Sequence, residues 1–374
     1  MFKHITLYRI GPDWSVDLAT FEEAIGKAPF AECGATQQKS SGFVSPRGEA
    51  NGALVEAVDG QLILKLRTDT KRVPADVLAK RVDEIAATIE DQTGRKPGKK
   101  QRKELKEQAL HELLPMAFTK SSSNLVWIDQ ENRLLMIDSA SQSKADEVVT
   151  LLAQTCQGLS MSLLQTAMSP AAAMTHWLGT GEAPAGFTID RECELKSTDE
   201  MKSVVRYGRH NLDTDEVKQH IVSGKVPTRV AMTWRDRVSF ILTDAMVLKK
   251  LAFLDVVFEG AVSVDKGETF DADVAIATGE LSQLIPDLVE ALGGEQTAPE
   301  PAAPLLEVDG LDPMYAAAVA IVIKHGKASI SLVQRHLRIG YNHAARLLEA
   351  MEQTGVVSHI NDLGQRTVLK GGAA

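Results

Sequence analysis

Residues Gly94 to Lys106 form a dense group of basic side chains in an otherwise acidic sequence. They read GRKPGKKQRKELK and contain seven basic residues and one acid. Exposed lysine and arginine side chains bind the phosphate backbone of a nucleic acid without regard to base sequence, because they displace its condensed counterions. The competing interpretation is a solvated loop and first helical turn whose charges only keep the surface hydrated.

A second and smaller basic cluster surrounds Tyr207. It consists of Arg206, Arg209 and His210. These groups can contact phosphate, although a histidine is only partly charged near neutral pH. The alternative interpretation is a surface loop ahead of a helix that starts near Asp213.

A search for catalytic motifs gives no enzyme signature. The sequence has no Gly-x4-Gly-Lys-Ser/Thr phosphate loop and no Gly-x-Ser-x-Gly elbow. A dinucleotide-binding pattern that begins at Gly179 is interrupted by Pro184, and an HExxH zinc pattern that begins at His111 is interrupted by Pro115. We therefore expect a protein that is not an enzyme and that needs no cofactor or metal.

One pair of carboxylates leaves a catalytic alternative open. Asp271 and Asp273 are two residues apart and would share one face of an extended strand. Paired carboxylates can hold magnesium for phosphoryl transfer, which would make the chain a metal-dependent nuclease. A solvated strand edge is the simpler interpretation of the same two residues.

The composition bounds the class of protein. The chain has 374 residues, a net charge of −9 and three scattered cysteines, which argue against a disulfide framework and a structural zinc site. The first residues lack the apolar core of a signal peptide, and the apolar run Ala316 to Ile323 is too short to cross a bilayer. We expect a cytoplasmic protein that does not interact with a membrane.

The elements that must position the basic residues divide into a body and a small module. Residues 294–310 read GEQTAPEPAAPLLEVDG, which is typical of a solvated linker and separates a body at 1–293 from a module at 311–374. Residues 309–374 carry seven basic and five acidic side chains, which leaves the rest at −11. A basic appendix on an acidic body suggests an anionic partner.

Periodicity predicts an α+β body. Alternating apolar residues indicate strands, two pairs of which form hairpins, and apolar residues at helical spacing indicate helices between them. Asp213 and Glu216 have the spacing of a capping box. The predicted strands are 62–67, 125–129 with 134–138, and 229–234 with 238–243, and the predicted helices are 74–92, 103–114, 213–224 and 282–292.

The C-terminal module has the pattern of a winged helix-turn-helix. A helix opens at Asp312-Pro313, a second is capped by Ser329, and a third runs from about Tyr341 to Thr354. Two short strands, 356–360 and 366–370, follow as a β-ribbon. Three helices and a ribbon in this order define the winged fold, whose second motif helix enters the major groove of DNA.

The third helix has two distinct faces. At 100° per residue, its apolar residues gather on one side, and Asn342, Arg346 and Glu349 lie on the other. These three side-chain types match the hydrogen-bonding edges of adenine, guanine and cytosine. Arg366 of the ribbon is expected to meet phosphate or the minor groove, as is Lys370. An ordinary solvated face is the competing interpretation.

The module resembles the gamma domain of the FtsK DNA translocases. The run ASISLVQRHLRIGYNHAARLLEAMEQTGVV and the preceding DPMYAAAVAIVIKHGKA carry the resemblance, which covers 311–370. It implies recognition of short G-rich polar sequences, with Asn342, Arg346 and Glu349 as the base-reading residues. His343 departs from the family, which usually has arginine there. No motor domain precedes the module, so only recognition is carried over.

The body resembles the RdgC family over about residues 1–295. The phrases FKHITLYRI, LHELLPMAFTKSSSNLVWID, LLMIDSAS and FDADVAIATGELSQLIPDLVEALGGE carry the resemblance. It implies a ring-shaped homodimer that passes duplex DNA through a basic hole without sequence preference and hinders RecA. The predicted architecture is thus an α+β ring-forming body with an appended winged helix, and the predicted location is the nucleoid.

The RdgC resemblance also suggests site residues. It places Phe118 at the contact between subunits, for which ordinary core packing is the competing interpretation. It places Arg209 with His210 at a position where the family has a Lys-Gln pair implicated in DNA contact. Met116 stands where the family has an arginine. With Arg206, the DNA-facing residues of the body are then predicted to be Lys99, Lys100, Arg102, Lys103, Lys120, Arg206, Arg209 and His210.

A third class of function also fits the sequence. A transcription regulator would pair the winged helix with a body that senses a small ligand. A large apolar pocket in the body would favour that interpretation.

Overall fold

The body is built on one large antiparallel sheet. The computed structural model describes residues 2–199, 202–259, 269–296, 312, 314–359 and 366–369. Within this part of the chain, 12 strands pair in the order β2-β4-β5-β6-β1-β12-β11-β10-β8-β9, while β3 pairs with β4 and β7 pairs with β1. The strands are β1 (Ile5–Ile10), β2 (Lys39–Val44), β3 (Val55–Val58), β4 (Gln61–Lys71), β5 (Thr119–Asp129), β6 (Leu134–Ile137), β7 (Met161–Leu163), β8 (Phe187–Ser197), β9 (Val204–Gly208), β10 (Lys225–Trp234), β11 (Val238–Thr243) and β12 (Val247–Phe253).

Helices cover the sheet, extend from its edge or form the C-terminal domain. No helix among the described residues combines the length and hydropathy needed to cross a membrane. The helices are α1 (Leu18–Ile25), α2 (Ala75–Thr93), α3 (Lys99–Leu113), α4 (Gln142–Thr155), α5 (Pro170–Thr180), α6 (Asp215–Val222), α7 (Thr269–Ala291), α8 (Tyr315–His325), α9 (Ile330–Leu337) and α10 (Tyr341–Gln353), with short 3-10 turns η1 (Leu114–Met116) and η2 (Asp255–Phe258).

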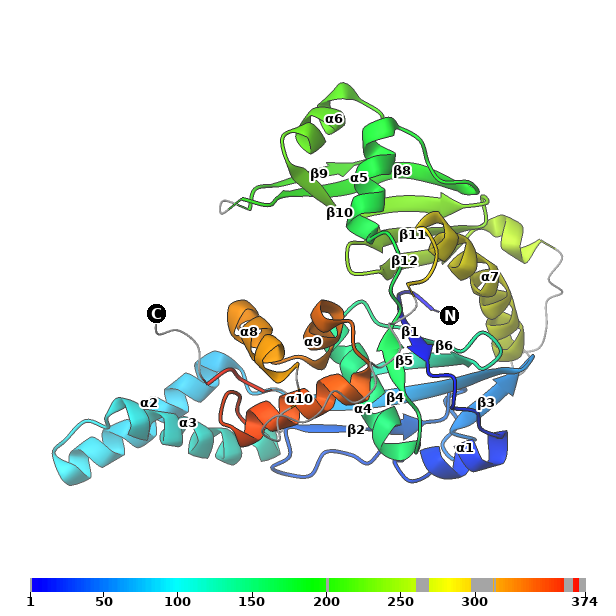
Figure 1. The fold of residues 1–374 in the computed structure, drawn as a ribbon. Coiled ribbons are helices and arrows are strands. Elements are labelled where there is room, and N and C mark those ends of the chain that lie inside the picture. Colours follow the sequence, from blue (N-terminus) through cyan, green and yellow to red (C-terminus); the bar gives the residue numbers. More distant parts are fainter. Residues whose placement is uncertain are drawn as a thin grey trace.

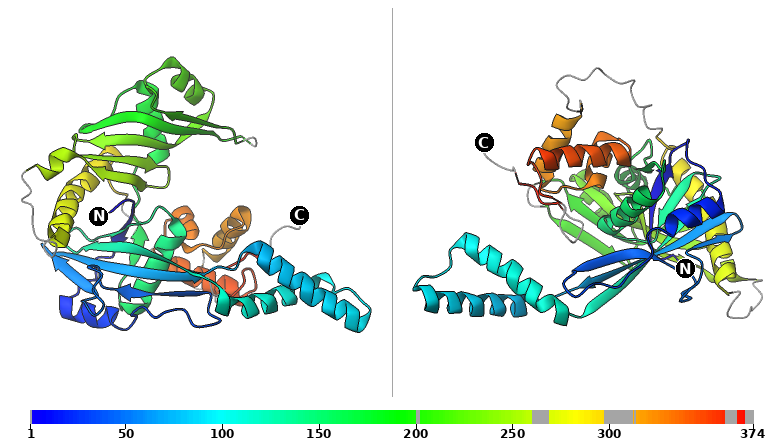
Figure 2. Two further views of the ribbon diagram at one scale, coloured as in Figure 1. Left: turned by 180° about the vertical axis from the view of Figure 1, so that it is seen from behind. Right: turned by 90° about the horizontal axis from the view of Figure 1, so that it is seen from below.

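The sheet bends, so that the ribbon of the body is C-shaped (Figure 1). One half carries β8 to β12 with α5 and α6, and the other carries β1 to β6 with α1 and α4. The halves are joined where β1 pairs with β12, with Ile5 opposite Leu248, and by α7, which runs along the closed side of the C. Figure 2 shows α2 and α3 projecting from the lower half as a separate pair of helices.

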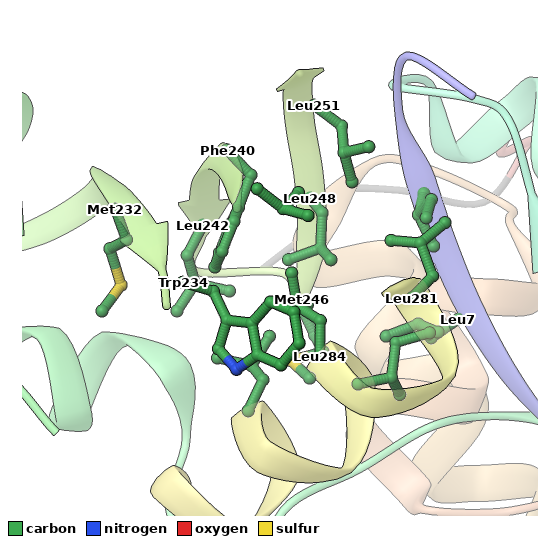
Figure 3. Close-up of a cluster of buried hydrophobic side chains, with 14 of the residues drawn as sticks. Leu7, Met232, Trp234, Phe240, Leu242, Met246, Leu248, Leu251, Leu281 and Leu284 are labelled. Carbon is green, nitrogen blue, oxygen red and sulfur yellow. The ribbon is translucent and has the colours of Figure 1, made fainter. Parts of the chain in front are cut away.

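One hydrophobic core runs through both halves and gives α7 its place. Leu7 and Trp127 of one half belong to the same buried cluster as Trp234 of the other half. Leu281 and Leu284 of α7 close this cluster (Figure 3). The indole nitrogen of Trp234 donates to the carboxylate of Asp287 on α7 at 2.8 Å, so the polar edge of the buried ring is satisfied.

The hairpins predicted from alternating apolar residues are confirmed. β5 pairs with β6 and β10 pairs with β11, both antiparallel, with Val126 opposite Ile137 and Val230 opposite Leu242. The predicted strand at 62–67 is the first half of β4. These elements are local in the chain, so a period of two was enough to find them.

The last helix of the body is longer than predicted. The expected segment 282–292 places Pro286 in a first turn, but α7 starts at Thr269 and Pro286 lies inside it. Proline removes one helical hydrogen bond and favours a helix start. Here the apolar face continues upstream through Val274 and Ala277, both buried, and this burial outweighs the lost bond.

One further local prediction is wrong. The capping box at Asp213 and Glu216 does not form, because Asp213 accepts from Lys218 and Glu216 accepts from the hydroxyl of Tyr207. Thr214 is the N-cap of α6 and makes no side-chain cap bond. Longer-range partners thus compete successfully with a capping pattern.

The linker starts later than predicted. Ala167 and Gln296 donate backbone hydrogen bonds to Gly294 and Gln165, each at 2.9 Å, which ties residues 294–296 to the body. The remainder of the predicted linker, from 297 to 310, lies outside the described residues.

The C-terminal domain consists of α8, α9 and α10 around a core of its own. The predicted apolar face of α10 is confirmed, since its four apolar residues are buried in that core. α8 starts at Tyr315, three residues after the predicted start at Asp312, whose carboxylate accepts from the backbone of Met314. Val357 pairs with Val368 in a single bridge where the ribbon was expected, and 360–365 lie outside the described residues. The core residues are Ala318, Val322, Val333, Ala344, Leu347, Leu348, Met351, Val356 and Val357.

Candidate nucleic-acid interface

The pair α2 and α3, called the helical arm below, presents the basic segment of the sequence. The two helices pack through a narrow apolar seam in which Leu105 and Ala109 of α3 are buried. Ion pairs add to the seam, because Arg81 of α2 pairs with Glu112 of α3 at 2.7 Å. Val77, which the sequence places on the apolar face of α2, is exposed, so the seam ends before the first turn of α2.

Four of the predicted DNA-facing residues lie at the start of α3. The helix begins at Lys99 rather than at the predicted residue 103. Four of its first five positions are therefore basic, namely Lys99, Lys100, Arg102 and Lys103. Its first turn contains no acidic residue. The start of a helix carries partial positive charge, and cations placed there repel it. A bound anion such as a phosphate would relieve this repulsion.

These four basic side chains differ in whether they have an ion-pair partner. Arg102 pairs with Asp83 of α2 at 3.0 Å, and both side chains are more than half exposed. Lys99, Lys100 and Lys103 are exposed, and the described part of the chain offers them no ion-pair partner. The three lysines are therefore the groups of the arm most available to an external anion.

An exposed apolar patch adjoins the base of the arm. Phe118 is 92% exposed and Met116 is 74% exposed, between the end of α3 and the start of β5. Lys120, another predicted DNA-facing residue, is exposed on β5 opposite Thr70. A phenylalanine ring with so little contact in its own chain is not part of the core, so the ordinary-core interpretation of Phe118 is wrong. Large exposed apolar side chains mark contacts with other molecules.

The second basic cluster lies on the opposite half of the body, at the edge strand β9 (Figure 1). Arg206 pairs with Glu194 at 2.5 Å, and its side chain is 70% exposed. Arg209 is exposed in a left-handed backbone conformation with φ of 56°. His210 is exposed and lies 5.3 Å from the ring of Tyr207, measured between centroids. All three residues are thus accessible, and Arg206 is the one that also has an ion-pair partner.

Glu194 is shared between Arg206 and a second arginine. Its carboxylate also pairs with Arg229 at 2.6 Å and accepts from Thr228 at 2.8 Å. Burial raises the pKa of Glu194, but the hydrogen bonds from Arg206 and Thr228 and the charge of Arg229 outweigh it and hold the pKa below its ordinary value. The carboxylate stays ionised and keeps both arginines.

The C-terminal domain shows part of the predicted base-reading stripe. Arg346 and Glu349 are exposed on α10, opposite its buried face. Asn342 lies in the first turn of α10, and its side chain is outside the described part. His343 is held by Asp312 at 2.6 Å. Lys370 lies outside the described residues.

Arg366 differs from its prediction as a free wing residue. Its side chain is only 12% exposed and pairs with Glu352 of α10 at 2.7 Å. The hydrogen bond from Arg366 is the largest cause of a lowered pKa at Glu352, so the pair stays charged on both sides. In this conformation Arg366 ties the ribbon to α10 rather than extending toward a ligand.

The carboxylate pair of the nuclease alternative is not arranged as a metal site. Asp271 and Asp273 lie in the first turns of a helix, where residues two apart point to different sides. Asp271 pairs with Arg47 at 2.6 Å. Across the described ranges, no group of three or more histidine, cysteine or carboxylate side chains is close enough to share a metal ion.

The cavities give little support to a ligand sensor. One has a volume of about 580 Å³ and is lined by residues of β2, β4 and β5 and of the adjoining loops, of which about half are polar or charged, including Lys65, Arg67 and Ser121. Another, of about 310 Å³, lies beside α7 and is crossed by the ion pair of Arg9 with Glu295. Neither is the large apolar pocket that a ligand-sensing regulator would need.

One contact was missed by the sequence altogether. Ser329 and Ser331 of α9 and Tyr341 of α10 make hydrogen bonds to Asp146 and Thr150 of α4, so the C-terminal domain is bound to the body. These partners are more than 180 residues apart, and no local pattern signals their pairing.

The fold and its charged surfaces define an antiparallel α+β body with a projecting basic arm and an appended three-helix domain. Comparisons with known proteins agree with this division. Residues 1–295 match the family model described as "RdgC: Putative exonuclease, RdgC", and residues 309–370 match the model described as "Ftsk gamma domain".

The chain belongs to the RdgC family, with an FtsK gamma domain at its C-terminal end. It is 46% identical over 299 residues to the recombination-associated protein RdgC of Dechloromonas aromatica, which covers 79% of this chain and 98% of that protein. It is 47% identical over 300 residues to the protein of the same name from Cupriavidus pinatubonensis, with 79% of this chain and 99% of that protein covered. Both resemblances seen in the sequence are thus confirmed.

Proposed function

We propose that this chain is a non-enzymatic DNA-binding protein that acts in homologous recombination. The observation that carries the proposal is the start of α3, where Lys99, Lys100 and Lys103 are exposed beside the positive end of the helix. This arrangement suits phosphate groups in any base sequence. The relatives named recombination-associated protein RdgC support the link to recombination.

The body would act as a homodimeric ring around duplex DNA. The C-shaped body supports this, because two such shapes related by a twofold axis can enclose a space (Figure 2). The exposed Phe118 is the proposed contact between subunits. Lys120, Arg206, Arg209 and His210 would join the arm in facing the DNA, with Arg206 contributing least because of its pairing with Glu194.

The C-terminal domain would act as a winged helix that adds sequence preference. Arg346 and Glu349 are exposed on α10, and Asn342 precedes them on the same helix. By the specificity of the FtsK gamma family, the preferred sites would be G-rich and polar. Attachment to a ring that already surrounds the DNA would raise the local concentration of each reader.

The effect on recombination would follow from the presence of the ring on duplex DNA. A closed ring on duplex DNA obstructs a protein that must polymerise or exchange strands there, so RecA is the proposed target of inhibition. The partners are then duplex DNA, a second copy of the chain and RecA, and the place of action is the nucleoid.

The salt dependence of binding tests the ring surface. The double variant Lys99→Ala, Lys100→Ala should lower the affinity for all duplexes and reduce the slope of log K against log salt by up to about 4, because a dimeric ring loses four phosphate contacts and each contributes roughly 0.9. The matched control replaces Lys3 and Lys144, two exposed lysines outside the arm. An unchanged slope in the double variant would overturn the assignment of the arm.

Plasmid cleavage tests the absence of catalysis. We expect supercoiled plasmid to stay intact during incubation with the pure protein and magnesium. Cleavage that disappears on Asp271→Asn would establish a nuclease instead.

A further inference from the structure

The C-terminal domain is held on α4 by a small set of polar contacts. Ser329 and Ser331 donate to the same carboxylate oxygen of Asp146, at 3.4 and 3.0 Å. The hydroxyl groups of Thr150 and Tyr341 lie 2.7 Å apart. Figure 1 shows α9 and α10 beside α4, on the side of the sheet away from α7.

Apolar contacts accompany these hydrogen bonds. Tyr341 is only 6% exposed and belongs to the buried cluster of the lower half of the body, not to the core of its own domain. Ile330 and Ala345 pack partly against the same cluster. The contact therefore covers the first turn of α10 and the start of α9.

The covered end of α10 is the end that a helix-turn-helix uses to read DNA. In that motif, the N-terminal residues of the recognition helix meet the base edges in the major groove. Tyr341 is the first residue of α10 and directly precedes Asn342. A duplex seated on this end would occupy the space that α4 fills here.

We propose that α4 is a docking surface that masks the sequence reader, so that the body and DNA compete for the same end of α10. This inference rests on the proposed function of the domain in reading DNA sequence. Fifteen residues separate Gln296 from Asp312, and a chain of that length spans at most about 50 Å, which is long enough for the domain to leave α4 while it stays tethered.

The contact is suited to reversible binding. Asp146 is half-buried, and desolvation raises its pKa to about 6 against the hydrogen bonds from Gln142, Ser331 and Ser329 and the charge of Arg335. The amide group of Gln334 is buried on α9 without a hydrogen-bond partner within the described part of the chain. Partial burial of the charged Asp146 offsets part of the stabilisation that its hydrogen bonds give the docked form, and the unpaired Gln334 amide makes the packing around α9 less favourable.

The test uses the full chain and changes only the body side of the contact. In Asp146→Lys, a cation replaces the shared acceptor, and the first turn of α10 should exchange its amide hydrogens faster. Sequence preference is read by selection from duplexes with a randomised central segment. If docked molecules outnumber open ones tenfold, the affinity for the enriched duplex should rise about tenfold in the variant.

Two further variants keep the test decisive. Glu131→Lys makes the same charge change at an exposed turn between β5 and β6, and it should leave both α10 exchange and sequence preference unchanged. Thr150→Arg blocks the contact with Tyr341 by size and should act like Asp146→Lys if that variant folds poorly.

The outcomes separate this inference from the proposed function. Faster exchange with a stronger sequence preference supports masking. Unchanged exchange and preference in both α4 variants overturn it. Faster exchange with no enriched sequence in any protein shows that docking is real but masks no reader, which overturns both the masking and the proposed sequence recognition.

Discussion

Replacing Phe118 with alanine is expected to weaken self-association without lowering the stability of the fold. The ring is 92% exposed and packs against almost nothing in its own chain. Removing it therefore leaves no cavity in the core, which is the usual reason that a phenylalanine truncation unfolds a protein.

The size of the effect follows from the area that the ring could bury on a second copy. Full burial of a phenylalanine side chain contributes about 2–3 kcal/mol at roughly 25 cal/mol per Å². Since about 1.4 kcal/mol corresponds to a tenfold change, one buried ring is worth a factor of roughly 30 to 150 in the dissociation constant. A twofold-symmetric contact that buries both copies of Phe118 doubles the free energy.

Sedimentation equilibrium of the pure chain measures this effect directly. Val222→Ala is the control, because Val222 is 87% exposed at the end of α6, far from the arm. We expect Phe118→Ala to shift the monomer–dimer equilibrium toward monomer by at least the single-ring factor, with an unchanged melting temperature at concentrations where both proteins are monomeric. A dissociation constant within twofold of the parent, or a melting temperature lowered by several degrees, would refute the reasoning.

Three other changes have expected outcomes. Arg346→Ala should cost about 1–3 kcal/mol on a selected duplex and nothing on random DNA in competition binding, and equal losses on both would contradict base reading. Docking should strengthen as the pH falls through about 6, because burial raises the pKa of Asp146 to about 6 in the docked form while undocking returns its carboxylate to water; Tyr8 and Tyr341, whose pKa values burial raises, face Asp146 and stay uncharged there, and the charge of Arg335 opposes the shift. Amide exchange of α10 measures this, and persistence of the pH effect in Asp146→Asn would contradict it. Leu281→Ala should destabilise the body by about 2–5 kcal/mol in urea unfolding, and a loss below 1 kcal/mol would contradict the shared core.

Local patterns predicted much of the fold. The hairpins of β5 with β6 and β10 with β11 are short in sequence separation, and each strand has one face in a core, so alternation identified them. The two-faced α10 was predicted for the same reason, since helical spacing alone assigns residues to sides. The length of α7 was not predicted, because a proline signals a boundary locally while the burial that overrides it comes from distant strands.

The site was predicted less completely, because availability depends on partners far away in the chain. Arg206 and Arg366 have the right residue type for DNA contact, yet Glu194 and Glu352 pair with them in the fold. The lysines at the start of α3 keep their predicted availability because the arm projects away from the acidic body (Figure 2). Asp146 was not singled out at all, since nothing near it in sequence signals the serines that it accepts from.

The continuity of the sheet has a mechanical consequence. Because β1 pairs with β12 and one apolar core spans both halves of the body together with α7, the two halves cannot hinge apart without breaking that core. Each protomer should therefore behave as one rigid body. If two protomers close around duplex DNA that has no free end, the proposed ring must open where they touch, so the strength of the proposed contact at Phe118 would govern how quickly DNA is admitted and released.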